Sequence, residues 1–280
     1  MIYFLLILMS LSFIYPILAI FVNSFMEPQE ICDSYSFITG NHNNQNSHEY
    51  MKIKLIPDML SFKQYINILF RQSFFLRMFW NSTGIVAAII IGQVLVSSIA
   101  AYVFCKISFK GRDKLFFLYV ITMMMPFQVT LVPNYLVVDK LGITNTYAAL
   151  ILPAIFAPFG VFLMKQFMNY IPKECIEAAS VDGAGHFGIF IHIILPMLKP
   201  AIASLSILLF IDYWNMVEQP ILFIDDAMKR PLSTYLSIIG KKDLHCAFAA
   251  STIYMLPPLL MFLYWECYLV EGIQLNSGIK

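Results

Sequence analysis

The sequence predicts an all-α integral membrane protein with six transmembrane helices. Hydrophobic residues make up 59% of its 280 residues, and charged residues only 12%. Its mean hydropathy is +0.73. A soluble domain of this length could not cover so much apolar surface with so few charges, so the expected environment is a lipid bilayer. The formal net charge of +1 argues against nucleic acid as a partner, because binding it requires a basic surface.

Six stretches have the length and composition of a membrane span, which needs about 20 mainly apolar residues in a helix. They are Ile2–Phe25, Ser82–Cys105, Leu115–Val138, Tyr147–Lys165, Leu198–Ile224 and Phe248–Val270. The first stretch lacks the basic residues with which a signal peptide begins, and its apolar run is longer than the apolar segment of a signal peptide. We therefore interpret it as a retained anchor.

The spans divide the chain into three parts. Residues 1–25 form the first transmembrane helix, residues 26–81 an extracytoplasmic loop with interfacial helices, and residues 82–280 a five-helix core. In the loop, residues 41–48 are too polar to be buried, whereas residues 57–65 and 70–76 resemble short interfacial helices. No internal repeat is found, so a transport pathway built from two similar halves would have to take its second half from another chain.

Two predicted spans contain residues that affect helix packing. Gly84, Ala88 and Gly92 lie four residues apart, a spacing that lets helix backbones approach closely in lipid, and we expect them to pack inside the bundle. Pro126 and Pro133 each remove a backbone donor and bend the third span. A kink beside a solute path and simple packing explain these prolines equally well.

Several function classes lack their characteristic residues. The chain has no P-loop, so it does not hydrolyse ATP itself, and we expect it to bind no cofactor or metal of its own. It also lacks the residue pairs of a membrane-embedded enzyme and the repeat and acidic relay of a proton-coupled transporter. The five cysteines form no C-x-x-C pair. A disulfide between Cys32 and Cys246, both on the expected outer side, is the less favoured alternative to free thiols.

The strongest motif lies between the fourth and fifth spans. Its seven positions at fixed spacing are Glu177, Ala178, Ala179, Gly183, Ile193, Leu195 and Pro196, with Asp182 directly before the glycine. Upstream, Pro172 suits the first turn of a helix, and Glu174 suits the positive end of its dipole.

The same stretch predicts a sharp turn followed by a second helix. Gly183 and Gly185 allow positive φ angles, and the second helix would place Phe187, Phe190, Ile191 and Ile194 on one face. The predicted product is a helix, a sharp turn and a helix, too short and polar to cross the membrane. An ordinary amphipathic interfacial loop is the alternative.

This segment, at about residues 168–196, resembles the cytoplasmic coupling loop of ATP-binding-cassette (ABC) importer permeases. The resemblance extends over nearly the whole chain and is to the carbohydrate-type permeases, specifically the shorter six-helix partner typified by the maltose system. Further similar positions are Tyr15-Pro16, Ser24-Phe25, Glu27-Pro28, Asn81-Ser82, Thr122–Pro126, Gln128, Leu141-Gly142, Asn145–Tyr147, Ile171–Glu174 and Trp214-Asn215.

The resemblance implies a type I importer permease that forms half of a sugar pathway and catalyses nothing itself. Its implied partners are a second homologous permease, two ATPase subunits that use ATP and Mg, an extracytoplasmic solute-binding protein and the lipid bilayer. The coupling role would fall on Glu177, Ala178, Ala179, Asp182, Gly183, Leu195 and Pro196. An ABC permease for a peptide, amino acid or polyamine is the alternative, because those families share the loop.

The resemblance also fixes the expected orientation. Lysines and arginines occur in loops on both sides, so the positive-inside rule alone does not decide it. A cytoplasmic coupling loop places both termini in the cytoplasm of a bacterial cell whose inner membrane the chain crosses several times.

One departure from the family concerns the fifth span. Asp212, Asn215 and Glu218 recur every three residues there, so they are expected to drift only modestly around one helical face. An ionisable group within a span usually faces a cavity or a partner. They either line the solute path or have structural roles, with Glu218 near the outer interface and Asp212 bonded to the partner permease. We weigh these two interpretations equally.

Overall fold

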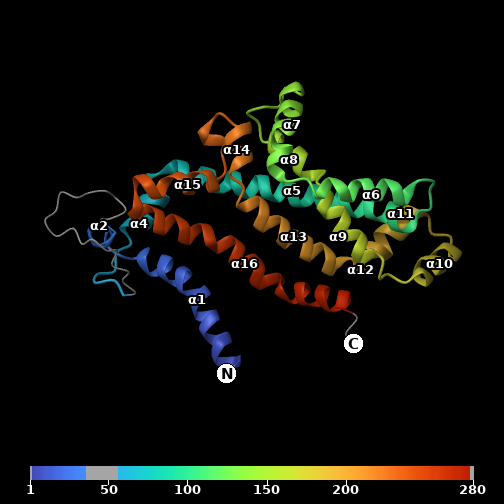
Figure 1. The fold of residues 1–280 in the computed structure, drawn as a ribbon, viewed down its shortest axis with the longest axis horizontal. Helices are drawn as coiled ribbons and strands as arrows, with labels where there is room; N and C mark the ends of the chain where they lie inside the picture. The colour runs from blue at the N-terminus through green and yellow to red at the C-terminus, as the bar shows by residue number, and fades with distance from the viewer. Residues whose placement is uncertain (1, 36–55, 278–280) are drawn as a thin grey trace. The chain divides into compact units, whose positions relative to one another are not determined.

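The computed structural model describes residues 2–35 and 56–277, and these residues are almost entirely helical (Figure 1). Within them the only extended pairing is an isolated antiparallel bridge between Met26 and Leu60. The all-α prediction is therefore confirmed. The polar stretch at residues 41–48 lies outside the described residues.

The chain divides into two compact units. The first comprises Met1–Asn81 and Pro231–Pro257, and the second Ser82–Arg230 and Pro258–Lys280. Helices α5 (Ser73–Lys106) and α16 (Leu244–Ser277) each contribute residues to both units.

The first unit contains the start of the chain and the segment before the last span. Besides parts of α5 and α16, its helices are α1 (Ile2–Asn23), α2 (Pro28–Ser34), α4 (Lys63–Ile66), the π-helix η1 (Asn67–Arg71) and α15 (Leu232–Lys242). The side-chain amide of Asn23 donates to the hydroxyl of Tyr35, and that of Gln64 donates to the carbonyl of Met26. Burial raises the pKa of Tyr35. These bonds fasten the segment after α1 to α1 and α4.

The start of α5 and the two cysteines of this unit can be compared with what the sequence predicts. Residues 74–76 belong to the first turns of α5 rather than to a short interfacial helix, because no helix-breaking residue separates them from the second span. Cys32 is exposed and Cys246 is buried, and both are free thiols. The thiol of Cys246 accepts a hydrogen bond from the amide of Asn67 at 3.4 Å.

The second unit holds the middle of the chain. Its helices are α6 (Arg112–Met123), α7 (Phe127–Lys140), α8 (Ala148–Ile155), α9 (Pro158–Met168), α10 (Lys173–Val181), α11 (His186–Ile189), the π-helix η2 (Phe190–Ile194), α12 (Leu195–Met197), α13 (Lys199–Trp214), α14 (Glu218–Phe223) and the 3-10 helix η3 (Ala227–Lys229). Two hydrophobic cores hold them. The lower core includes Ala101, Met164, Ile189 and Leu205. The upper core includes Ile85, Ile89, Leu150, Met216 and Phe223.

Four described helices are long and apolar enough to cross a membrane: Ile2–Asn23, Ser73–Lys106, Ala148–Met168 and Leu244–Tyr268. Two bent pairs pass the same test when each is counted as one span, and they bring the number to the predicted six. The pairs are Arg112–Met123 with Phe127–Lys140, bent by 104°, and His186–Met197 with Lys199–Trp214, bent by 71°.

The bent pairs change the third and fifth predicted spans. The third is broken at Pro126, which is the N-cap of α7 with extended ψ, because proline cannot continue the hydrogen-bonding of the preceding helix. The fifth was predicted to run to Ile224, but α13 ends at Trp214. There the side-chain amide of Asn215 donates to the carbonyl of Ile211 at 2.7 Å, which satisfies a carbonyl at the helix end.

Candidate functional site

The segment with the strongest motif forms a hairpin of two helical arms, residues 172–197. The first arm is α10, and the turn closes through two backbone bonds: the amide of Gly183 donates to the carbonyl of Ser180 at 3.1 Å, and the amide of Ala184 to that of Ala179 at 2.9 Å. Gly183 has a φ of +85°. This arrangement is a Schellman motif, in which the residue after the C-cap must adopt the left-handed conformation. Asp182 is the C-cap of α10.

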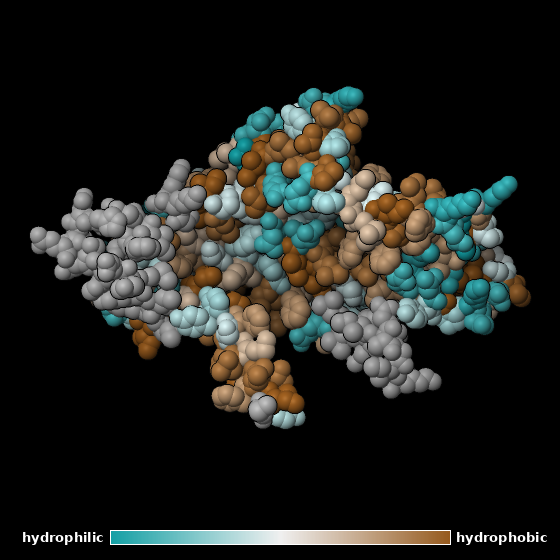
Figure 2. All heavy atoms as spheres, viewed as in Figure 1, coloured by the Kyte–Doolittle hydropathy of each residue, from teal (hydrophilic) through white to brown (hydrophobic). Residues whose placement is uncertain are grey.

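The tip of this hairpin, residues 172–187, is largely exposed. Glu177 and Ala178 are exposed, and Ala179 is half-buried. Two large apolar residues flank the turn without cover: Val181 is 88% exposed and Phe187 77%. Figure 2 shows hydrophilic side chains gathered over the part of the visible face that contains α10. The tip is thus a polar surface from which two apolar side chains project.

Two details of the tip differ from the sequence-based expectations. Helix α10 begins at Lys173 with Pro172 as its N-cap, so the proline lies one residue before the first turn. Gly185 has φ −74° and ψ 164°, an extended conformation open to any residue. Only Gly183 requires a positive φ angle, because the Schellman motif has a single left-handed position.

The apolar face predicted for the second arm is confirmed only in part, because Ile194 is buried and Phe190 packs against the lower core but the other two residues are exposed. Ile189 and Ile194 are buried, whereas Phe187 is 77% exposed and Ile191 38%. The cause is the π-helix η2 over Phe190–Ile194. Its wider turn places side chains five residues apart above one another, so Ile189 and Ile194 share the buried face.

Leu195 and Pro196 lie at the base of the second arm, away from the tip residues of the motif. They belong to α12, and the chain bends by 71° where α13 follows. Pro196 has no backbone N–H to give to the preceding turn, which agrees with the irregular helix just before it. Leu198, between the two helices, is fully buried in the lower core.

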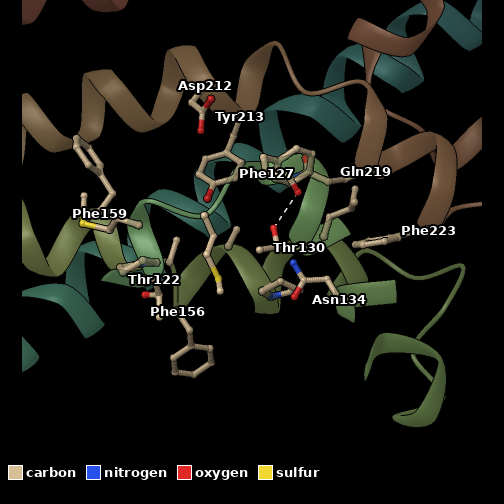
Figure 3. A pocket seen from close by; sticks show the side chains of 17 residues that line it. Thr122, Phe127, Thr130, Asn134, Phe156, Phe159, Asp212, Tyr213, Gln219 and Phe223 are labelled. Atoms are coloured by element: carbon tan, nitrogen blue, oxygen red, sulfur yellow. Dashed lines mark hydrogen bonds between the residues drawn. The ribbon is translucent and has the colours of Figure 1, made fainter. Parts of the chain in front are cut away.

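A second candidate site is a pocket of about 520 Å³ beside the upper core. Its rings come from Phe127, Phe156, Phe159, Tyr213 and Phe223, and its polar groups from Thr122, Thr130, Asn134, Asp212 and Gln219. Figure 3 shows Thr130 and Asn134 on α7 and Tyr213 on α13 pointing towards the same space. The Thr130 hydroxyl donates to the carbonyl of Phe127 at 2.9 Å. The volume lies in the range of small-molecule sites.

A neighbouring pocket of about 570 Å³ is bordered by Asp212, Asn215 and Glu218 together. Asp212 borders both pockets. The three residues do not share one helical face as predicted, because α13 ends at Trp214 and Glu218 begins α14. The turn between the two helices nevertheless brings them to one cavity. Among the residues that line the two pockets, Asp212 and Glu218 are the charged ones.

Several lining residues were not predicted as site residues from the sequence. Phe127, Thr130 and Asn134 are spaced three and four residues apart, which places them on one face of α7. Polar residues at helical spacing inside an apolar span were the available signal for Thr130 and Asn134. The contributions of Tyr213 and Gln219 depend on where α13 ends and have no such signal.

Comparison with known proteins connects these features to a family. Residues 93–265 match the family described as "Binding-protein-dependent transport system inner membrane component". The Arabinooligosaccharides transport system permease protein AraQ of Halalkalibacterium halodurans is 32% identical over 228 residues, which cover 80% of this chain and 81% of that protein. The sn-glycerol-3-phosphate transport system permease protein UgpE of Brucella melitensis is 33% identical over 207 residues, which cover 70% of this chain and 72% of that protein.

The fold is shared with a solved structure. A chain of a bacterial ABC transporter involved in the import of the acidic polysaccharide alginate superposes with a TM-score of 0.77 at 21% identity, covering 95% of this chain and 94% of the other. The resemblance to ABC importer permeases drawn from the sequence is confirmed. The chain belongs to the family of binding-protein-dependent transport system inner membrane components.

Proposed function

We propose that this chain forms half of the solute pathway of an ATP-driven sugar importer and couples to ATPase subunits through the hairpin. The observation that carries the proposal is the exposed tip, a compact knob held by a Schellman turn with Val181 and Phe187 uncovered. Contact with a partner would remove the apolar surface of these two side chains from water, which favours association. Glu177, Ala178, Ala179, Asp182 and Gly183 would form the contact, and Leu195 and Pro196 would set the angle of the second arm.

The remaining subunits follow from the family. Two ATPase subunits would use ATP and Mg, a second homologous permease would complete the pathway, and an extracytoplasmic protein would deliver the solute. The hairpin would then lie in the cytoplasm, with both termini on the same side of the inner membrane. This chain would bind no cofactor and catalyse no reaction.

The pocket chemistry supports a sugar as the solute. Sugars present hydroxyl groups together with apolar ring faces, and the pocket combines aromatic rings with hydroxyl, amide and carboxylate groups. AraQ is named for arabinooligosaccharides and UgpE for sn-glycerol-3-phosphate, so related permeases serve chemically different solutes. An ABC permease for a peptide, amino acid or polyamine is the alternative.

Reconstitution of the complete transporter with Gly183→Pro tests the coupling role. Proline cannot adopt the φ of +85° and lacks the N–H that bonds to Ser180. We expect normal membrane insertion and loss of solute-stimulated ATPase activity. Persistent stimulation in this variant would contradict the proposal.

The solute class is tested by stimulation of the wild-type complex. Proteoliposomes with the complete transporter and its binding protein are supplied with an arabinooligosaccharide mixture, a dipeptide mixture or spermidine. Stimulation of ATP hydrolysis by the oligosaccharides alone supports a sugar importer. Stimulation by one of the other solutes would establish the alternative and leave the coupling role intact.

A further inference from the structure

We propose that the last turn of α5 is the joint that carries movement of the hairpin to the pocket, with Tyr102 as its positioning residue. The inference rests on the proposed function, because it presupposes that ATPase subunits move the hairpin. It assigns to α5 a task that the motif residues of the hairpin do not perform. These residues meet the ATPase, whereas α5 receives the displacement.

The last turn of α5 contacts the base of the first arm and the beginning of the second arm. The Lys106 ammonium donates to the carbonyl of Ile171 at 3.0 Å, just before the first arm. The Tyr102 hydroxyl lies 3.3 Å from Nδ1 of His186, where the second arm begins. Its ring also lies 5.4 Å from that of Phe190. Because residues 102 and 106 are one helical turn apart, a single turn of α5 contacts both arms of the hairpin.

Burial in a shared hydrophobic core reinforces the contact between α5 and the hairpin. Tyr102 is only 5% exposed, and it shares the lower core with Ile171, just before the first arm, and with Ile189 and Ile194 of the second arm. The thiol of Cys105 adds a bond to the side-chain carbonyl of Asn169 at 3.1 Å. The chain before the first arm and the middle of the second arm are therefore buried in the same core as the end of α5, while most of the tip is exposed. A push on the tip would move both arms and the end of α5 together.

Within the second unit, helix α5 is also well suited to transmit a displacement along its axis. It runs without a break from Ser73 to Lys106, whereas the other spans that contribute to the two cores of this unit are interrupted or bent. Ile85 and Ile89 of the same helix pack in the upper core with Phe223, a residue that lines the pocket of about 520 Å³. At a rise of about 1.5 Å per residue, Ile89 lies roughly 20 Å along the axis from Tyr102.

Spatial connection alone does not establish energetic coupling, so the test measures coupling directly. The complete transporter is reconstituted with Tyr102→Phe, with His186→Ala and with both changes. The readout is the number of solute molecules taken up per ATP hydrolysed. A defect of folding or assembly lowers uptake and hydrolysis together and leaves this ratio unchanged, whereas a loosened joint lowers the ratio.

We expect each single variant to lower uptake per ATP about threefold, the modest effect of losing one hydrogen bond. The double variant should be no worse than either single one, because both changes remove the same bond. His186 is exposed, so its replacement leaves the fold intact. Tyr119→Phe is the matched control, since its hydroxyl bonds to the Phe156 carbonyl at 3.3 Å without touching the hairpin.

Three results would contradict the proposed role of α5. The first is a wild-type value of uptake per ATP in both single variants. The second is a ninefold loss of uptake per ATP in the double variant. The third is a loss of uptake per ATP in Tyr119→Phe equal to that in Tyr102→Phe. In each of them the wild-type transporter still couples ATP hydrolysis to uptake, so the proposed function stands while this inference falls. A wild-type chain that never associates with an ATPase overturns both.

Discussion

The hairpin and the pocket lie in the same unit of the molecule but are built in opposite ways. The turn of the hairpin is closed by backbone bonds among residues 179–184, so its shape is decided over six consecutive positions. The pockets draw residues from α6, α7, α8, α9, α13 and α14, between Thr122 and Phe223 of the chain. A change in the hairpin should therefore act through backbone conformation, and a change in the pocket through charge and side-chain shape.

The largest effect is expected from valine at the left-handed position of the turn. Gly183→Val places a β-branched residue at a φ of +85°, which such residues avoid, and should open the Schellman turn. We expect solute-stimulated ATPase activity of the reconstituted transporter to fall at least about tenfold, while the amount inserted into the membrane is unchanged.

Gly185→Val is the matched control, only two residues away. Gly185 has an extended backbone, and a Cβ atom there would meet nothing within 4 Å. This variant should retain at least half of the stimulated activity. Equal losses in both variants would show that bulk at the tip, rather than the turn conformation, controls coupling.

A smaller effect is expected from removal of charge at the pockets. Asp212→Asn combined with Glu218→Gln keeps the shape of both side chains and removes both negative charges that face the cavities. If these groups line the solute path, uptake should fall about three- to tenfold with normal assembly, because hydrogen bonds to charged groups are stronger than neutral ones.

The control for this variant is Asp139→Asn, which removes an exposed carboxylate at the end of α7. Transport is measured as initial uptake in proteoliposomes, with the amount of assembled complex quantified beside it. Wild-type uptake in the double variant would exclude the pathway role and leave the structural interpretation of the two acids.

The two regions also differ in how far the sequence reveals them. The positive φ of Gly183 was predictable, because helix formers followed by glycine encode a helix stop within a few residues. The apolar face of the second arm was not, since the predicted face assumed a regular α-helix and the π-helix at Phe190–Ile194 shifts the register. A helical period can be counted in a sequence only while the period is constant.

For the pocket, helix ends were the limiting factor. Asp212, Asn215 and Glu218 border one pocket, but the sequence placed them on one helix, although α13 ends at Trp214. The apolar run continues past that point, so composition alone shows no stop. The six apolar spans were predictable because hydrophobicity over about 20 residues averages out such local events. The break at Pro126 was signalled as a kink, but its 104° bend depends on packing with distant residues.

The smallest effect is expected in α5, the helix that packs in the cores of both regions. A Cβ atom at Gly92 would overlap the side chain of Ile155, whereas one at Gly84 would meet nothing within 4 Å. Gly84→Ala should stabilise the purified chain by up to about 1 kcal/mol, the helix propensity gained over glycine. In Gly92→Ala the same gain is offset by overpacking of about 1–3 kcal/mol.

The two alanine variants should therefore differ in thermal midpoint by a few degrees in detergent, with Gly92→Ala the less stable. The comparison sharpens the contrast between the regions, because both glycines belong to the small-residue spacing expected to pack inside the bundle. Equal midpoints would mean that Ile155 moves aside without cost, in which case the contact of α5 with α8 is loose. A lower midpoint for Gly92→Ala would instead show that α5 and α8 are closely packed at this contact. Close packing is what α5 needs if it transmits movement from the hairpin to the pocket.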